Sequence, residues 1–119
     1  AERMAAWLKG NLPKDAGVRA SPARRARDTA EALTKKFDTV REIGTSATAP
    51  AVLKAAGWPR GERTVVVVGH QPTLGQAAAL ALTGKTGDWS IKKGAIWWLV
   101  ARSPNEVVVR VVIAPDMLK

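Results

Sequence analysis

The sequence predicts a single α/β domain of three layers, with helices on both sides of a mainly parallel sheet. Its 119 residues have the length of one compact domain. Segments with strand patterns alternate with segments with helix patterns, as in parallel α/β folds. The strand predicted at 64–68 ends in four successive valines, and a run without polar alternation indicates a strand covered on both faces. Near the C-terminus we expect antiparallel edge strands.

Residues 1–8 predict an amphipathic helix, because the apolar side chains at positions 1, 4, 5 and 8 fall on one stripe. Gly10 is well placed to end this helix. No Ser, Thr, Asp or Asn precedes it as an N-cap, although such a cap is usual at a helix start. A helix already under way at residue 1 indicates that the parent protein continues upstream.

Residues 17–20 predict a short strand, and Ser21-Pro22 predicts that a helix follows at once. A serine hydroxyl suits the N-cap, and the fixed φ of proline suits the first helical position. The residues at 26, 30, 33 and 37 share one face of this helix, and we expect that face to pack on the sheet.

The rest of the chain continues the alternation of strands and helices. Residues 39–43 predict another strand, and residues 51–56 predict a short helix after a loop. After the valine-rich strand, an alanine-rich helix is predicted at 73–82. Two further strands, at 96–100 and 107–113, are joined by a predicted turn.

The composition excludes several classes of protein. With 46% hydrophobic and 24% charged residues, the chain is not of the disordered type. It contains no cysteine, which excludes disulfides and thiolate metal sites. No signal segment opens it and no apolar stretch is long enough to span a bilayer, so we expect a cytoplasmic protein without a membrane partner.

The net charge of +9 suits a polyanionic partner, because Lys and Arg neutralise phosphates. The basic residues are spread along the whole chain and do not form one arm. Nucleic-acid binding is therefore a competing interpretation that we do not favour over a solvated basic surface.

Two strand ends are candidates for a binding site, because ligands of open α/β sheets bind outside the carboxyl ends of the strands. Ser21 and an arginine-rich helical turn follow the strand at 17–20, and Gly69-His70 follows the strand at 64–68. Both ends would present cations, hydroxyls and free backbone N–H groups, which together suit a phosphate.

His70 and Arg25 are the candidate catalytic residues. His70 is the single histidine of the chain, and it stands directly after a buried strand and a glycine. Arg25 lies in a first helical turn, where a cation opposes the helix dipole unless an anion binds between them. Arg24 and Arg27 fall on other faces of the helix, and we expect them to be solvated.

Other catalytic signatures are missing from the sequence. It contains neither a Gly-rich Walker loop nor a G-x-S-x-G elbow nor a paired carboxylate dyad. A lone histidine cannot form a metal cluster. We therefore expect neither a metal site nor another cofactor.

Four segments resemble the histidine phosphatase superfamily, in the order and spacing of its SixA-type phosphohistidine phosphatases. Residues 21–30, Ser-Pro-Ala-Arg-Arg-Ala-Arg-Asp-Thr-Ala, resemble the family's S-P-x-x-R-A-x-Q-T-A segment. Residues 67–72, Val-Val-Gly-His-Gln-Pro, resemble its second-histidine motif. Residues 4–10 resemble the helix before the first of these motifs, and residues 114–119 resemble the short C-terminal tail. The resemblance implies a phosphoglycerate mutase-like fold and one domain over residues 1–119.

The resemblance also implies a role for each site residue. Arg25 would clamp the phosphate, and His70 would be the second pocket histidine, donating a hydrogen bond to the transferring phosphoryl group. Both would stabilise charge on the phosphoryl oxygens. The supporting residues of the phosphate site would be Ser21, Thr29, Gly69 and Gln71. Asp28 stands where the family has glutamine, and no role is assigned to it.

The family's R-H-G motif, whose histidine becomes phosphorylated during turnover, has no counterpart, since the chain contains no Arg-His pair. One imidazole cannot attack the phosphorus and also stabilise the group under attack, so His70 does not replace it. We therefore expect an N-terminal strand with the nucleophile upstream of residue 1. We expect the chain alone to be inactive.

The substrate class follows from the acids near the site. Residues 43–61 contain no Asp or Glu, which leaves Glu42 as the candidate general acid. An alcohol leaving group needs such an acid, whereas a protonated imidazole is already a good leaving group. This favours a phosphatase of a phosphohistidine domain over a phosphatase of small phosphate esters. A non-catalytic phosphate or phosphoprotein binder is the third alternative, and the oligomeric state is open.

Overall fold

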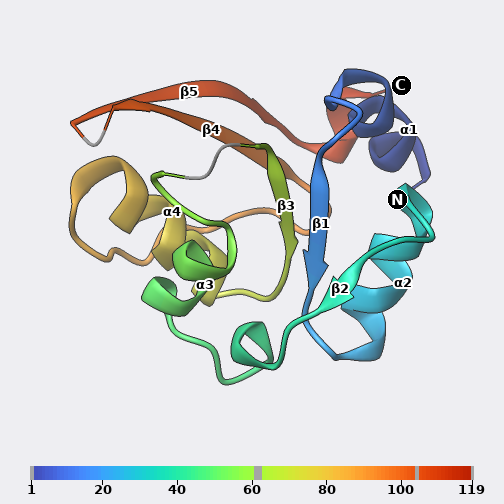
Figure 1. The fold of residues 1–119 in the computed structure, drawn as a ribbon, viewed down its shortest axis with the longest axis horizontal. Helices are drawn as coiled ribbons and strands as arrows, with labels where there is room; N and C mark the ends of the chain where they lie inside the picture. Colours follow the sequence, from blue (N-terminus) through green and yellow to red (C-terminus); the bar gives the residue numbers. More distant parts are fainter. Residues whose placement is uncertain (1, 61–62, 104, 119) are drawn as a thin grey trace.

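The computed structural model describes residues 2–60, 63–103 and 105–118. Its strands form two sheets, a parallel sheet of order β2-β1-β3 and an antiparallel pair β4-β5 (Figure 1). The elements in chain order are α1 (Glu2–Asn11), β1 (Gly17–Ala20), α2 (Arg24–Leu33), β2 (Asp38–Thr39), the 3₁₀ turn η1 (Arg41–Ile43), α3 (Ala49–Ala55), β3 (Val65–Val68), α4 (Thr73–Thr83), β4 (Ile96–Ser103), β5 (Glu106–Ile113) and the 3₁₀ turn η2 (Pro115–Met117). The α/β class and a parallel sheet are confirmed. The two C-terminal strands are antiparallel, as expected, but within the described residues they form a sheet of their own and do not extend the edge of the parallel sheet.

The register of the parallel sheet sets the position of the site. Gly17 pairs with Val65 at one end of the β1–β3 ladder, and Ala20 pairs with Val68 at the other. The two strands therefore end at the same level. The chain leaves the sheet there at Ser21 and at Gly69.

The valines of β3 face opposite sides in turn. Val66 and Val68 pack on a cluster formed by β1 and α2, and Val67 packs on the cluster formed by η1, α3 and α4. In Figure 1, α1 and α2 lie on one side of β1 and β3, and α3 and α4 lie on the other. The two apolar environments explain why the valine run contains no polar residues. Each valine is only half-buried, however, whereas a strand covered on both faces was predicted.

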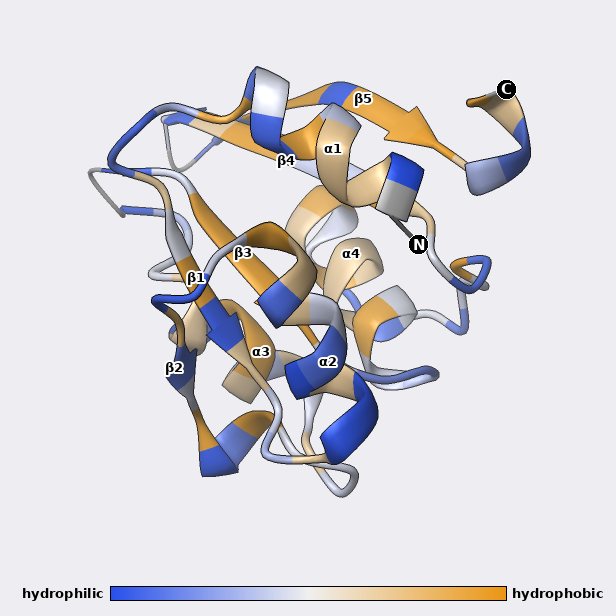
Figure 2. Cartoon of the chain, turned by 90° about the vertical axis from the view of Figure 1, so that its right-hand side faces the viewer, coloured by the Kyte–Doolittle hydropathy of each residue, from blue (hydrophilic) through white to orange (hydrophobic). Residues whose placement is uncertain are grey.

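Helix α1 contacts both sheets. Ala5 and Leu8 pack together with Leu33, and Val66 of β3 and Trp98 of β4 both pack against this cluster. Figure 2 shows the mostly hydrophobic colouring of β3, β4 and β5, in contrast to the mostly hydrophilic colouring of α2. Helix α1 therefore packs against both the parallel and the antiparallel sheet.

The predicted start of the second helix is wrong by two residues. Ser21 is not its N-cap and Pro22 is not its first residue: the N-cap is Ala23, without a side-chain cap, and the helix begins at Arg24. The reason is that the Ser21 hydroxyl accepts a hydrogen bond from the Ala23 N–H at 3.2 Å and also bonds to His70. These bonds turn the chain before the helix begins.

Phe37 does not belong to that helix either. Thr34 has extended backbone angles and ends α2, so Phe37 packs against the β1–α2 cluster from the connecting segment. The strand predicted at 39–43 is shorter, because after β2 the chain forms η1 and places Ile43 in the core at 1% exposure.

Smaller differences concern helix ends. The first helix continues past Gly10 to Asn11, and the Leu12 N–H still bonds to the Leu8 carbonyl at 2.9 Å. Helix α3 begins two residues before the predicted position, because the Thr48 hydroxyl accepts from the Ala51 N–H at 3.3 Å and caps it. Residue 1 and the predicted turn residue at 104 lie outside the described residues.

Among the described residues, no helix combines the length and the apolar character needed to cross a membrane.

Candidate functional site

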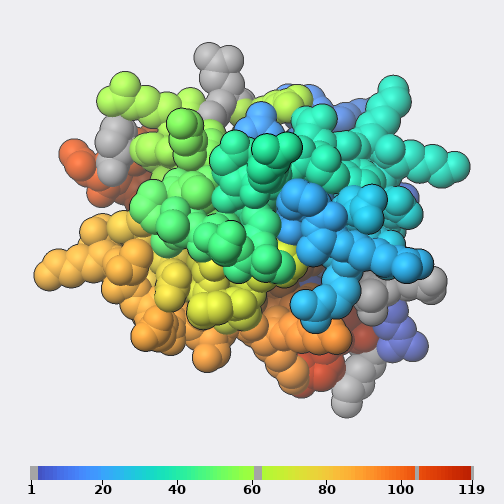
Figure 3. Space-filling view, turned by 90° about the horizontal axis from the view of Figure 1, so that it is seen from below, coloured from blue at the N-terminus to red at the C-terminus, as the bar shows by residue number. Residues whose placement is uncertain are grey.

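The carboxyl ends of β1 and β3 bring Ser21 and His70 into contact. The Ser21 N–H donates to the Val68 carbonyl at 2.9 Å, extending the ladder by one bond. The His70 Nε2 lies 2.7 Å from the Ser21 Oγ, although the two residues are 49 positions apart. Figure 3 looks onto this edge of the molecule, where the segments around residues 20, 45 and 70 meet.

Ser21 is fully buried, with 0% of its surface exposed. Its hydroxyl oxygen accepts from the Ala23 N–H at 3.2 Å and is hydrogen-bonded to His70. The half-buried His70 is therefore anchored to the start of the second helix. The serine hydroxyl therefore links the histidine to the start of the helix, a contact that a helix-capping pattern alone does not reveal.

Arg25 lies in the first turn of α2 and is exposed. Its carbonyl accepts from the Thr29 hydroxyl at 3.0 Å, and its guanidinium makes neither a hydrogen bond nor an ion pair with another described residue. The first turn of the helix contains no acid and no side-chain cap, so its free N–H groups and the nearby cation favour an anion. Arg24 and Arg27 are exposed, as expected.

The supporting residues have structural roles that the structure makes visible. The hydroxyl of Thr29 bonds within its own helix, to the Arg25 carbonyl. The amide of Gln71 accepts from the Gly75 N–H at 2.8 Å and donates to the Trp89 carbonyl at 3.3 Å. A Cβ at Gly69 would lie 3.3 Å from the side chain of Leu74. The hydrogen bonds of Thr29 and Gln71 therefore lie within the frame around the site, and Gly69 leaves space there for the Leu74 side chain.

The first turn of α4 fixes the backbone of His70. The Leu74 N–H donates to the His70 carbonyl at 2.9 Å. The buried Thr73 hydroxyl donates to the Ala47 carbonyl at 3.2 Å, which ties α4 to the loop before α3. No sequence pattern indicates this link, because Thr73 and Ala47 are far apart in the chain and belong to segments of different type.

Gly75 allows a loop to lie directly on α4. A Cβ at this position would lie 1.6 Å from the Trp89 carbonyl oxygen, which no side chain can tolerate. Together with the Gln71 amide, this contact holds the segment around Trp89 next to the turn that contains His70. A glycine inside an alanine-rich helix was the single sequence feature that could have indicated it.

Glu42 is exposed in η1, after β2. No hydrogen bond or ion pair joins it to Ser21 or His70 within the described ranges. The described residues contain no group of three or more His, Cys, Asp or Glu side chains that could hold a metal ion.

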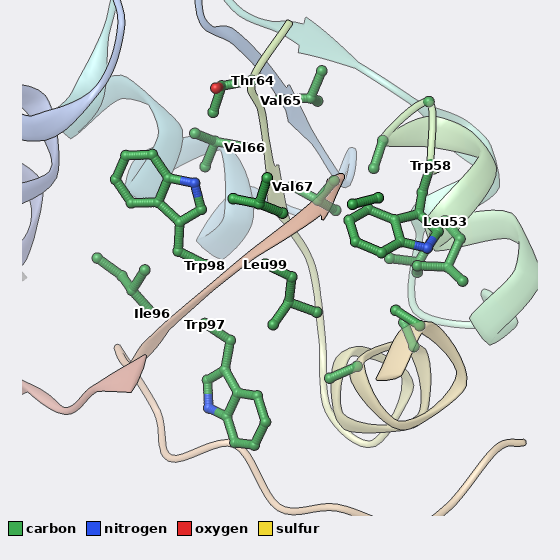
Figure 4. Close-up of a pocket in the computed structure, with 18 of the residues that line it drawn as sticks. Leu53, Trp58, Thr64, Val65, Val66, Val67, Ile96, Trp97, Trp98 and Leu99 are labelled. Carbon is green, nitrogen blue, oxygen red and sulfur yellow. The ribbon is translucent and has the colours of Figure 1, made fainter. Parts of the chain in front are cut away.

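A separate groove runs between the two sheets, with a volume of about 520 Å³. Residues 65–67 of β3 line one wall and residues 95–101 line the other. In Figure 4, Ile96 and Trp98 project to one side of β4, and Trp97 and Leu99 project to the other. Within the described residues β3 pairs only with β1, and β4 pairs only with β5, so both strands turn an open edge toward the groove.

No protein-family model matches the chain, and no curated protein matches it.

Proposed function

We propose that the chain is the larger part of a histidine-phosphatase domain whose complete form removes the phosphoryl group from phosphohistidine on a protein. The observation on which the proposal rests is the meeting of His70 and Ser21 at adjacent parallel strand ends, where α2 also begins. A hydrogen-bonding imidazole, the free N–H groups of a helix start and the exposed cation of Arg25 are ligands suited to a phosphoryl group.

In the proposed reaction the phosphoryl group moves twice. The upstream nucleophilic histidine attacks the phosphorus, the P–N bond to the substrate imidazole breaks, and that imidazole leaves with a proton. Water then cleaves the new P–N bond and releases inorganic phosphate. His70 and Arg25 stabilise the charge on the phosphoryl oxygens in both steps, and neither forms a covalent bond.

The groove offers a place for the N-terminal strand that the proposal expects upstream of residue 1. Strands of a sheet lie about 4.8 Å apart, and a strand between β3 and β4 would find backbone partners on both open edges. Helix α1 already covers Val66 on one wall and Trp98 on the other. With this strand in place the two sheets would become the central layer of a three-layer sandwich, with β4 and β5 at one edge.

The absence of cysteine agrees with a reducing compartment, and a cytoplasmic location is part of the proposal.

The proposal is tested on the chain extended upstream, where it expects an R-H-G segment; an extended chain without such a segment would contradict the proposed reaction. The assay follows loss of phosphate from a phosphohistidine-containing protein. We expect Arg25→Ala and His70→Ala each to lose at least about a hundredfold in rate, the usual effect of removing a charge-stabilising donor. Arg24→Ala is the matched control, because it removes an exposed cation from the same helical turn and should stay within about twofold of the parent rate.

The outcomes separate the alternatives. Near-normal rates for both site variants would refute the assigned roles. Hydrolysis of small phosphate esters that Glu42→Gln abolishes would favour the ester phosphatase. Phosphate binding that depends on Arg25 and His70, with no turnover by the extended chain, would indicate a non-catalytic binder. Binding of nucleic acid that falls steeply with salt and ignores Arg25 would favour that competing interpretation.

The placement of the strand has a test of its own. A synthetic peptide with alternating apolar residues that ends in R-H-G is added to the 119-residue chain, and tryptophan fluorescence reports binding, since Trp97 and Trp98 line the groove. A peptide of the same composition with two prolines, which cannot form the ladder, is the control. Equal binding of the two peptides would contradict insertion as a strand.

A further inference from the structure

The hydrogen bond between Ser21 and His70 determines where the imidazole carries its proton. A neutral imidazole has one N–H donor and one bare nitrogen, and the partner of one nitrogen selects the tautomer. Nε2 is the nitrogen that faces the Ser21 hydroxyl, at 2.7 Å. The direction of this one hydrogen bond therefore decides which nitrogen is left as a donor.

The surroundings of the hydroxyl fix that direction. A serine hydroxyl has one proton and can accept through two lone pairs, and the Ala23 N–H already donates to one of them. If Nε2–H donated to the oxygen as well, the hydroxyl proton would need another acceptor. Ser21 has no exposed surface, and the described residues offer its hydroxyl no bonding partner besides Ala23 and His70. A buried donor left without an acceptor is strongly disfavoured, so the hydroxyl donates to Nε2.

We infer that Ser21 is a positioning residue that holds neutral His70 in the Nδ1–H tautomer and leaves Nδ1–H as the donor toward a phosphoryl oxygen. The assignment of the tautomer stands on the buried hydrogen bond alone. The assignment of the phosphoryl oxygen as the acceptor rests on the proposed function.

The backbone supports the same arrangement. The Leu74 N–H holds the His70 carbonyl at 2.9 Å, so the residue is fixed at its main chain by α4 and at Nε2 by Ser21. Nδ1 has no hydrogen-bond partner among the residues that the structure describes. A ring that is held at two points and has one free donor is preorganised for an acceptor.

Nitrogen NMR tests the inference on the 119-residue chain, without any turnover. His70 is the only histidine, so the spectrum contains a single imidazole, and long-range ¹H–¹⁵N correlations show which ring nitrogen bears the proton. In spectra recorded at alkaline pH we expect Nδ1 to be protonated and Nε2 to be bare. A proton on Nε2 in the unmodified chain would overturn the inference, and this measurement does not depend on the folding of any variant.

Variants then show that the serine is the cause. Ser21→Ala removes the donor and should allow both tautomers to be populated, whereas Ser21→Thr keeps a hydroxyl and should restore Nδ1–H. Thr29→Ala is the matched control, because its hydroxyl donates to the Arg25 carbonyl of the same helix and has no bond to His70 among the residues that the structure describes. An unchanged tautomer in a folded Ser21→Ala chain would refute the role of Ser21.

Titration with inorganic phosphate separates the inference from the proposed function. We expect phosphate to move the Nδ1 resonance, and Ser21→Ala to weaken phosphate binding by about two- to tenfold, the effect of one hydrogen bond. If His70 is the Nδ1–H tautomer but its ring resonances do not move when phosphate is added, the role of Ser21 in the free protein is confirmed. The same result would refute the phosphate site.

Discussion

Gly75→Ala tests whether the Trp89 segment lies directly on α4. The new Cβ would lie 1.6 Å from the carbonyl oxygen of Trp89 and 2.8 Å from its carbonyl carbon. Both atoms belong to the backbone, so a side-chain rotation cannot relieve the contact. The segment or the helix has to move, and the two hydrogen bonds of the Gln71 amide would be stretched with it.

The magnitude is the difference between two opposing effects. Alanine is favoured over glycine inside a helix by about 1 kcal/mol. Overpacking of a tight contact costs about 1–3 kcal/mol, and a clash with backbone belongs at the upper end of that range. We therefore expect a net loss of about 1–2 kcal/mol in the free energy of unfolding. For a domain of this size that corresponds to a fall in Tm of about 3–10 °C.

Thermal unfolding followed by circular dichroism measures this shift, and Gly10→Ala is the matched control. Gly10 also lies inside a helix, but a Cβ there would have nothing within 4 Å. The control should keep the full propensity gain, up to about 1 kcal/mol, and raise Tm by a few degrees. If Gly75→Ala were as stable as Gly10→Ala, the close approach of Trp89 to α4 would be wrong.

Three further substitutions test other parts of the frame. Thr48→Ala removes the cap of α3 and the 3.3 Å bond to the Ala51 N–H, and urea unfolding should show a loss of about 1 kcal/mol; an unchanged midpoint would contradict the cap. Ile43→Ala, at a side chain with 1% exposure, should cost about 2–5 kcal/mol in the same assay, and a loss below 1 kcal/mol would place Ile43 outside the core. Lys92→Ala breaks the pair with Asp116; because the side chains of Lys92 and Asp116 are 65% and 63% exposed, Tm should fall by about 5 °C at most, and a larger fall would reveal a stronger interaction.

Local sequence patterns predicted the positions of β1, β3 and α4. Residues 17–20 form β1, as predicted, and the strand predicted at 64–68 is β3, which begins one residue later, at Val65. The helix predicted at 73–82 is α4, which ends at Thr83. Because parallel strands end at a common edge, the rule for ligand sites in α/β sheets also placed Ser21 and His70 at the same edge.

Tertiary contacts explain where local patterns failed. A serine before a proline is a good helix start, but the Ser21 hydroxyl is used by His70 and by the Ala23 N–H. The segment around Ile43 has strand-forming residues, yet burial of that side chain draws it into a 3₁₀ turn. Neither contact is visible within a window of neighbouring residues.

The supporting residues show the same limit for the site. A motif that resembles a family's sequence assigns a role to each position, but it does not say what each side chain touches. The Gln71 amide bonds to Gly75 and Trp89, and the Thr29 hydroxyl bonds to its own helix. On the proposed function, these side chains would therefore affect a bound phosphate only through the positions of His70 and Arg25.

The groove and the site are connected through β3. The carboxyl end of this strand presents His70, and its open edge forms one wall of the groove. Ser21 lies beside His70 because β1 pairs in parallel with β3 and Ala20 stands opposite Val68. On the proposed function, the N-terminal strand would pair in parallel with the edge of β3 that faces the groove. It would then end level with β1 and β3, and the residues after it would lie on the side of His70 opposite to Ser21. A nucleophile at the carboxyl end of that strand would thus be delivered to the phosphoryl site by the same pairing rule that placed the serine.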